Sequence, residues 1–234
     1  MPLILKNRNP NLVEWMDRQD CDIELLFNTY RQFKTINRLL SGWDKIYRIN
    51  IKPHLMYTAK PVSILDIGCG AGDILRYLRD LANKDGFKLN LTGIDPDIRA
   101  IEFIKQQSIS DEIQFYPYRS EELIKEGRRF DIVITNHLLH HLNRKEMSAI
   151  TKDAALLARK LVIFSDIERS DIGYAAFATV APLLFRKSYI VKDGLISIKK
   201  SFTKEELQDT FAYPWIIKKQ FPFRLLAILE KEHQ

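Results

Sequence analysis

The stretch of sequence that decides the fold is Ile64-Leu65-Asp66-Ile67-Gly68-Cys69-Gly70-Ala71-Gly72-Asp73. A short apolar run here gives way to three glycines spaced two apart, and a helical pattern follows at residues 73–83. Glycines at this spacing let the backbone turn tightly and bring bare amides against a ligand, while the start of a helix adds a partial positive charge. The stretch therefore predicts a strand, a binding loop and a helix in direct succession.

Two carboxylates indicate which ligand suits this loop. The dinucleotide fingerprint G-x-G-x-x-G would require Gly or Ala at position 73, where this chain has Asp. Asp66, beside the loop, would also repel a pyrophosphate. Asp95 comes 23 residues after Gly72, at the end of the next expected strand, where a carboxylate can accept both hydroxyls of a ribose. An adenosine with a cationic, phosphate-free tail fits these residues, and S-adenosylmethionine is such a molecule.

Short β-branched runs alternate with helical patterns from residue 63 onward, which is typical of βαβ units around a parallel sheet. Strands are expected at residues 62–67, 88–95, 113–116, 130–135, 161–165, 215–220 and 224–230. Helices are expected between them at residues 73–83, 97–107, 120–125, 143–159 and 203–210. The last two strands have a short connection, which favours an antiparallel pair. The expected fold class is α/β, a seven-stranded and mostly parallel sheet with helices on both faces.

Composition excludes several classes of protein. The chain has 234 residues with 36 Lys and Arg against 30 Asp and Glu, and its two cysteines are too few for a disulfide framework or a thiolate metal site. The longest weakly polar run, residues 173–185, is shorter than the roughly 20 residues that cross a bilayer. A signal peptide is not recognisable at the amino terminus. We therefore expect a cytoplasmic protein, with no transmembrane segment and no nucleic-acid partner.

The segment after the glycine loop completes a resemblance to a known family. Residues 130–142 read Phe-Asp-Ile-Val-Ile-Thr-Asn-His-Leu-Leu-His-His-Leu. Together with the loop and Asp95, this segment resembles class I S-adenosylmethionine-dependent methyltransferases, in the version found in small-molecule and quinone-pathway enzymes. Residues 29–33 and 36–40 also resemble helices of methyltransferases encoded beside bacterial polyketide synthases. The resemblance implies a Rossmann-like fold and S-adenosylmethionine as the cofactor.

The resemblance also suggests how the chain is divided. Residues 61–234 are expected to form the methyltransferase domain, with an insertion at about 166–200 where this fold places substrate lids. Residues 1–60 are expected to form a helical amino-terminal extension that closes over the acceptor. Its apolar residues recur at helical spacing at Leu26, Tyr30, Phe33, Ile36 and Leu40.

The resemblance assigns cofactor contacts residue by residue. In the family the glycine loop holds the methionine part, the acid ending the second strand binds ribose, and the acid before the loop lies near the amino acid end. The expected cofactor-binding residues are Asp66, Gly68, Cys69, Gly70, Gly72, Asp95, Pro96, Ser120 and Asn136. Arg119 departs from the pattern, because the family often has an acid there and arginine cannot accept from the adenine amino group. Adenine is then expected to rest on Pro96, Ile98 or Tyr118.

The acceptor is expected at the same sheet edge. His140 and His141 are the catalytic candidates, and the expected substrate contacts are Tyr30, Phe33, His137, Asp166, Tyr174 and Phe177. Because His140 and His141 are adjacent, at most one is expected to face the acceptor. His140 is favoured as the base, since His141 lies closer to the Asn143 helix cap. No metal site is expected, because the histidines lack an i,i+4 partner.

These residues predict transfer of the methyl group of S-adenosylmethionine to a small aromatic or lipophilic hydroxylated metabolite, with O-methylation favoured. The product from the cofactor would be S-adenosylhomocysteine. Two alternatives stay open at this point, a nucleic-acid methyltransferase and a non-catalytic S-adenosylmethionine-binding protein. A nicotinamide-dependent dehydrogenase fits least well, given Asp73. The chain is expected to act as a monomer or a homodimer.

Overall fold

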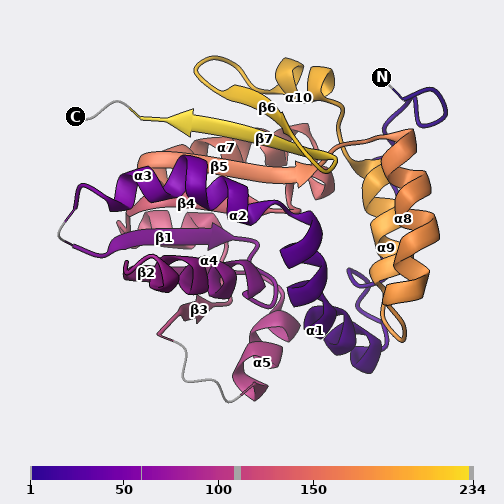
Figure 1. The fold of residues 1–234 in the computed structure, drawn as a ribbon, viewed down its shortest axis with the longest axis horizontal. Coiled ribbons are helices and arrows are strands. Elements are labelled where there is room, and N and C mark those ends of the chain that lie inside the picture. Colours follow the sequence, from indigo (N-terminus) through magenta and orange to yellow (C-terminus); the bar gives the residue numbers. More distant parts are fainter. Residues whose placement is uncertain (1, 59, 108–111, 232–234) are drawn as a thin grey trace.

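The computed structural model describes residues 2–58, 60–107 and 112–231, and its centre is a seven-stranded sheet (Figure 1). The strand order across the sheet is β3-β2-β1-β4-β5-β7-β6. The strands are β1 Val62–Ile67, β2 Leu89–Ile94, β3 Gln114–Tyr116, β4 Phe130–Asn136, β5 Ala158–Ile167, β6 Ile216–Gln220 and β7 Arg224–Glu230. This arrangement confirms the fold class predicted from the sequence.

The direction of the strands places the functional edge of the sheet. β1 through β5 pair in parallel, whereas β7 runs antiparallel to both β5 and β6. The carboxyl ends of the five parallel strands therefore meet at one edge, on the right in Figure 1. Ligands of open α/β sheets bind outside this edge, where the strand order reverses between β1 and β4.

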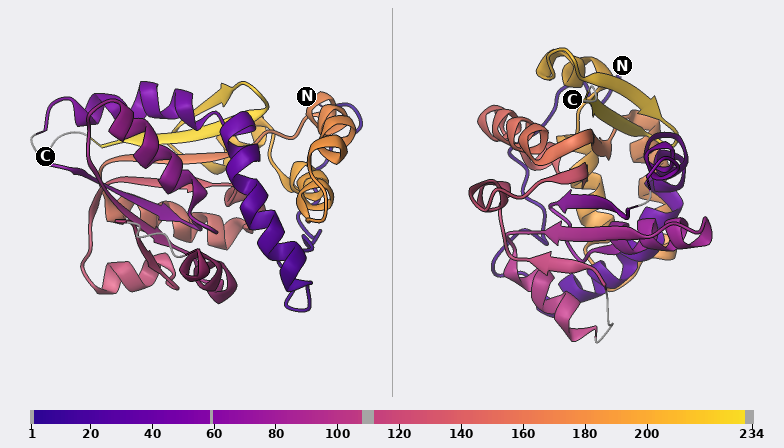
Figure 2. Two further views of the ribbon diagram at one scale, coloured as in Figure 1. Left: turned by 60° about the horizontal axis from the view of Figure 1, so that its bottom comes forward. Right: turned by 90° about the vertical axis from the view of Figure 1, so that its left-hand side faces the viewer.

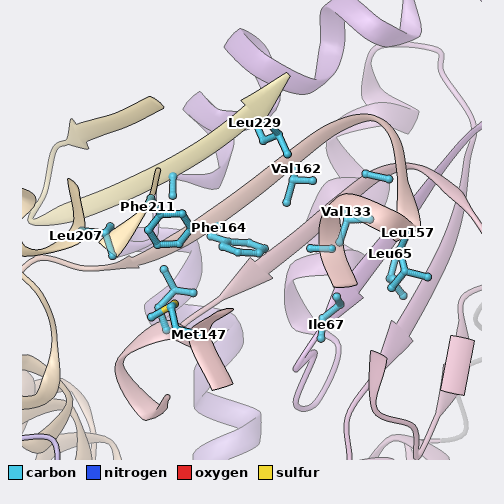
Figure 3. Close-up of a cluster of buried hydrophobic side chains, with 14 of the residues drawn as sticks. Leu65, Ile67, Val133, Met147, Leu157, Val162, Phe164, Leu207, Phe211 and Leu229 are labelled. Carbon is cyan, nitrogen blue, oxygen red and sulfur yellow. The ribbon is translucent and has the colours of Figure 1, made fainter. Parts of the chain in front are cut away.

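Helices cover both faces of the sheet. One face packs against α2 Trp43–Ile46, the π-helical turn η1 Tyr47–Ile51, α3 Lys52–Leu55 and α4 Asp73–Lys84. The other face packs against α6 Ser120–Lys125, α7 Arg144–Leu157 and α10 Lys204–Thr210, and Figure 3 shows this core. In β1, Ile64 faces the first core and Leu65 the second. A strand buried on both sides needs a continuous apolar run, which is why the pattern around residue 64 does not alternate.

Three further helices stand beyond the carboxyl edge. They are α1 Ile23–Leu40, α8 Asp171–Leu184 and α9 Ile190–Lys200. Figure 2 shows α1 between the sheet and the α8–α9 pair. α1 begins at Asp22, whose side chain accepts the N–H groups of Glu24 and Leu25. Helix α5, Ile98–Gln106, packs against α1 through Phe103 and Tyr30.

Residues 2–22 are not helical, which corrects part of the expected helical extension. They form a strap along α8 and α9, and acidic side chains satisfy its backbone N–H groups. Asp171 accepts the N–H groups of residues 3–5, and Asp193 accepts those of Trp15 and Met16 at 2.7 and 3.0 Å. Asn9 N–H donates to the Lys199 carbonyl. The strap therefore depends on distant partners, which a search for helical periodicity cannot detect.

One other local expectation, the boundary between α7 and β5, was wrong. α7 ends at Leu157 and β5 begins at Ala158, three residues before the expected strand, because Ala158 already pairs with Phe130 of β4. α5 buries Ala100, Ile101 and Phe103, whereas Ile98 at its start is 50% exposed. Among the described residues, the helices are all too short or too polar to cross a bilayer.

Candidate active site

A cavity of about 530 Å³ opens at the carboxyl edge of the sheet. Its floor comes from the loops after β1, β2 and β4, and its walls come from α1, α8, α9 and the strap. Most of the expected site residues line it, namely Asp66, Gly68, Cys69, Gly70, Asp95, Pro96, Asn136, Tyr30, Phe33, His137, His140, His141 and Phe177. The fold thus gathers residues from five separate segments around one space.

The glycine loop has the conformation that its spacing predicts. Gly68, Gly70 and Gly72 all have positive φ, which side chains of L-residues rarely adopt. A Cβ atom at Gly72 would also lie 2.4 Å from the ring of Phe115, so glycine is required there twice over. The N–H groups of Gly68 and Cys69 donate to the Ile94 carbonyl, which ties the loop to the end of β2.

Asp66 is a buried acidic side chain in the lining of the cavity. Its side chain is 1% exposed, and its Oδ1 atom has no hydrogen-bond partner among the described residues. Burial, together with the charges of Asp73 and Asp95, raises the pKa of Asp66 well above its ordinary value. An unpaired buried acceptor is costly, so a cationic ligand group at this position would stabilise the site.

Asp95 holds the backbone around the next part of the cavity. Its Oδ2 accepts the N–H of Gly70 at 2.8 Å, and its Oδ1 accepts the N–H of Asp97 at 2.9 Å. Burial raises its pKa, although these two hydrogen bonds work in the opposite direction. A carboxylate oxygen can accept more than one hydrogen bond, so hydroxyl groups of a ligand can still bind here.

Cys69 lies between two of the glycines but is not a reactive thiolate. Burial, with the nearby charge of Asp66, raises the pKa of the Cys69 thiol well above its ordinary value. A nucleophilic cysteine needs the opposite shift. What Cys69 offers to the cavity is therefore its small size and its position in the loop.

At the other end of the cavity, His140 is held between two carboxylates. Its Nδ1 lies 2.7 Å from Asp166 Oδ1, its backbone N–H donates to Asp166 Oδ2 at 2.9 Å, and its Nε2 lies 3.3 Å from Glu14 Oε1. Burial alone would lower the pKa of His140, but Asp166 and Glu14 raise it to about 9. With this raised pKa the His140 ring is protonated at neutral pH, whereas a general base has to be unprotonated.

His141 faces the same cluster, which corrects the expectation that only one of the two histidines does. The two ring centroids are 4.2 Å apart, and His141 Nε2 lies 3.7 Å from Glu14 Oε1. The cause is the 3₁₀ turn Leu139–His141, in which successive side chains are about 120° apart instead of the near-opposition of a strand. On its other side, His141 Nδ1 lies 3.2 Å from both Asp17 Oδ2 and Lys200 Nζ.

Glu14 is the residue that the sequence analysis missed. It comes from the strap, is 3% exposed and lines the cavity between the two histidines. Burial would raise the pKa of Glu14, but its contact with His140 and the positive charge of Lys200 lower it to about 2. No local motif marks this position, because residues 2–22 carry neither regular periodicity nor a glycine loop.

Asn136 and His137, at the end of β4, are fixed by Arg224. The Arg224 guanidinium donates to Asn136 Oδ1 at 2.7 Å and lies 2.9 Å from His137 Nε2. Trp43 Nε1–H also donates to Asn136 Oδ1, at 3.1 Å. Burial and the charge of Arg224 lower the pKa of His137 well below its ordinary value, so its ring is neutral and accepts from the guanidinium.

Four of the expected site residues do not line the cavity: Gly72, Ser120, Asp166 and Tyr174. Gly72 shapes the loop, and Asp166 lies behind His140. The Ser120 hydroxyl donates to Asp153 Oδ2 at 2.6 Å, and the ring of Tyr174 packs against Lys199. Ile98 and Tyr118, considered as supports for adenine, are also absent from the lining, whereas Pro96 is part of it.

Comparison with known proteins agrees with this geometry. Residues 64–160 match the family described as "Methyltransferase domain". Among curated proteins, the chain is similar to the ubiquinone/menaquinone biosynthesis C-methyltransferase UbiE of Campylobacter jejuni subsp. jejuni, with 26% identity over 167 residues, 69% of this chain and 70% of the relative. It is also similar to a ubiquinone biosynthesis O-methyltransferase of Pelagibacter ubique, with 26% identity over 43% of this chain and 39% of the relative.

Solved structures show the same fold. The plantazolicin methyltransferase BpumL in complex with SAH superimposes with a TM-score of 0.63 and 16% identity, covering 93% of both chains. The family match begins inside β1, includes Asp66, the glycine loop and Asp95, and ends in β5. The domain match over residues 64–160 and the similarity to UbiE support a class I S-adenosylmethionine-dependent methyltransferase.

Proposed function

We propose that this protein methylates a hydroxyl group of a small, lipophilic aromatic acceptor. The observation that carries the proposal is the character of this cavity, which has an acidic end, an apolar middle and a histidine-containing end. Such a cavity suits two ligands placed end to end, one cationic and polar and the other apolar with a polar group at its far end.

The acidic end suits the cofactor. Asp66 would pair with its ammonium group, the amides of the glycine loop would bind its carboxylate, Asp95 would accept its ribose hydroxyls, and Pro96 would support adenine. When bound, the cofactor supplies an activated methyl group on sulfur. The contribution of the chain is then to align the acceptor and to exclude water.

The middle and far end suit the acceptor. Tyr30, Phe33 and Phe177 provide an apolar wall, and the acceptor hydroxyl would reach the polar end formed by Glu14, His140 and His141. A methyl acceptor on a long nucleic acid would need an open groove with basic walls, whereas this space is bounded by apolar helices. Small molecules are therefore the acceptors that the walls favour.

The experiment is a methylation assay with three acceptors of one shape. Purified full-length protein is given S-adenosylmethionine with 2-naphthol, 2-naphthylamine or naphthalene-1,4-diol, and products are identified by mass spectrometry and NMR. We expect a methoxy product from a hydroxylated acceptor. A ring-methyl or N-methyl product would contradict O-methylation while leaving the methyltransferase assignment in place.

The ribose contact can be tested by calorimetry. Asp95→Ala removes charge-assisted hydrogen bonds worth roughly 1.5–3 kcal/mol each, so the Kd for S-adenosylhomocysteine should rise by about tenfold or more. NAD should bind to neither protein. An unchanged Kd in the variant would mean that the ribose lies elsewhere, and NAD binding as strong as that of S-adenosylhomocysteine would contradict the proposed cofactor end.

A further inference from the structure

Three side chains at the acceptor end bring metal-binding atoms together. Glu14, His140 and His141 each offer one donor atom, and these atoms all lie within 4.8 Å of one another. They come from the strap and from the turn after β4, and all three residues line the cavity. We propose that Glu14 and the Nε2 atoms of His140 and His141 form a binding site for a divalent transition-metal ion of the zinc type.

The two distances from Glu14 to the histidines are close to those of a tetrahedral site. Glu14 Oε1 lies 3.3 Å from His140 Nε2 and 3.7 Å from His141 Nε2. Bonds of about 2.0–2.1 Å to a tetrahedral ion place neighbouring ligand atoms roughly 3.4 Å apart. The two distances from the Glu14 oxygen are therefore within a few tenths of an ångström of those that an ion requires, and all three donor atoms lie within 4.8 Å of one another.

The orientation of both imidazoles supports the same site. Each histidine directs its Nδ1 toward a carboxylate, Asp166 at 2.7 Å for His140 and Asp17 at 3.2 Å for His141, and each leaves Nε2 toward Glu14. Carboxylates behind the ring nitrogen opposite the metal are the usual support of metal-binding histidines. His140 Nε2 is buried and makes no well-directed hydrogen bond within the described part of the chain, although Glu14 is near. An ion at this nitrogen would displace its proton into solvent.

Lys200 is the competing cation in this cluster. Its Nζ lies 3.5 Å from Glu14 Oε1 and 3.2 Å from His141 Nδ1. Metal binding through His141 Nε2 requires the proton on Nδ1, where it would donate to Asp17, so the Lys200 ammonium would have to turn away from Nδ1. The positive charge of Lys200 neutralises part of the charge of the three carboxylates around the histidines, so the cluster must be tested for an ion directly.

The donor set narrows the choice of ion. Two imidazole nitrogens and one carboxylate oxygen suit Zn²⁺ and its first-row neighbours, whereas Mg²⁺ and Ca²⁺ prefer oxygen ligands alone. Three protein ligands leave one position open, and both histidines line the cavity. Only the fourth ligand, an oxygen of the acceptor, rests on the proposed function, and the site itself does not.

The test is metal binding by the full-length protein, without any activity measurement. Chelator-treated protein is titrated with Zn²⁺ by calorimetry and with Co²⁺ by visible absorption. We expect one ion per chain and the intense absorption bands of four-coordinate Co²⁺. Glu14→Gln and His141→Ala should each weaken binding by at least about 100-fold. His54→Ala, which alters a histidine of α3 outside the cavity, is the matched control and should bind like the wild type.

Two measurements keep the result interpretable. Circular dichroism melts establish that each variant is folded, and Zn²⁺ should raise the Tm of the wild type and of His54→Ala but not of the two ligand variants. Lys200→Met should bind Zn²⁺ at least as tightly as the wild type does. The proposal is overturned if the wild type binds no ion, if all variants bind equally, or if binding appears only after Lys200 is replaced.

Discussion

The two ends of the cavity are built in different ways. The cofactor end comes from the loop after β1 and the end of β2, so its key residues lie within about 30 positions of the sequence, from Asp66 to Pro96. The acceptor end joins Glu14 of the strap, His140 after β4, Asp166 of β5 and Lys200 of α9. The first end can form once two strands pair, whereas the second requires the strap and the insertion to be in place.

The two ends of the cavity also differ in the protonation of their buried carboxyl groups. Asp66 is a buried acid whose Oδ1 has no hydrogen-bond partner among the described residues, and burial raises its pKa. Glu14 is equally buried, but its contact with His140 and the charge of Lys200 lower its pKa to about 2. Burial alone therefore does not decide whether a carboxyl group in this cavity is protonated, because nearby charged groups can reverse the shift of its pKa. Among the described residues, the charged groups that shift the pKa of Asp66 are acidic, whereas at the acceptor end His140 and Lys200 keep Glu14 ionised.

Removing the strap should have the largest effect on turnover, because the deletion removes part of the acceptor end and leaves the cofactor end unchanged. Deletion of residues 1–21 removes Glu14 but leaves the Asp22 cap of α1 intact. Misplacing an acceptor by about 1 Å can cost about 100-fold, so turnover should fall at least that far. The Kd for S-adenosylhomocysteine should stay within about threefold, equivalent to less than 1 kcal/mol.

Calorimetry and single-turnover kinetics on the same samples check both parts of this prediction. Asp171→Asn is the control, because it weakens only the first anchor of the strap and keeps Glu14 in the chain. Full activity in the deletion would show that the acceptor end does not depend on the strap. Loss of cofactor binding in a folded deletion would show that the two ends are not separable.

Asp66→Asn tests the cofactor end, where it should weaken cofactor binding but stabilise the protein without ligand. Losing a charge-assisted contact of roughly 1.5–3 kcal/mol should weaken cofactor binding by about tenfold or more. The same change should stabilise the protein without ligand at neutral pH. Because the folded pKa of Asp66 is raised, the unfolded chain loses its proton first, and wild-type stability falls as pH rises from the ordinary value to the raised one. The variant lacks this loss.

Asp131→Asn is the matched control, because it should change the stability of the protein at neutral pH in the opposite direction. Asp131 of β4 accepts the N–H and the hydroxyl of Ser63, which contribute to the lowering of its pKa. Its stabilisation is present above the unfolded pKa and disappears as pH falls, so the variant should lose stability at neutral pH. Urea unfolding across a pH series measures both. If Asp66→Asn were also destabilising near pH 7, Asp66 would have a partner that the fold does not reveal.

Much of the cofactor end could be predicted from the sequence because its signals are local. The glycine loop must follow a strand directly, and Asp95 is placed by the length of one βα unit. Helix starts were equally readable, since the capping boxes at Asn143 and Thr203 each depend on a partner three residues away. In each case the interacting groups are close in sequence, so spacing alone fixes the geometry.

The acceptor end could not be predicted in the same way. Glu14 meets His140 across 126 positions, and nothing in the strap indicates which residue turns inward. The two histidines share one cluster because the chain tightens into a 3₁₀ turn, a local change that the apolar pattern does not encode. Asp166 was expected to contact the substrate, but its place behind His140 follows only from the register of β5 against β4.

The smallest predicted effect compares two aromatic residues of α8. Phe177 lines the cavity, and a Cβ atom at Gly194 would lie 2.4 Å from its ring, so α9 holds the ring closely in place. Tyr174, one turn earlier, lies outside the lining and packs against Lys199. Phe177→Leu keeps an apolar wall of similar size and should cost less than about 1.5 kcal/mol, raising the acceptor KM by about threefold. Tyr174→Leu should leave KM unchanged, and steady-state kinetics with the best acceptor measures both. Equal effects of the two changes would show that α8 influences the acceptor through its overall position and not through the one ring that reaches the cavity.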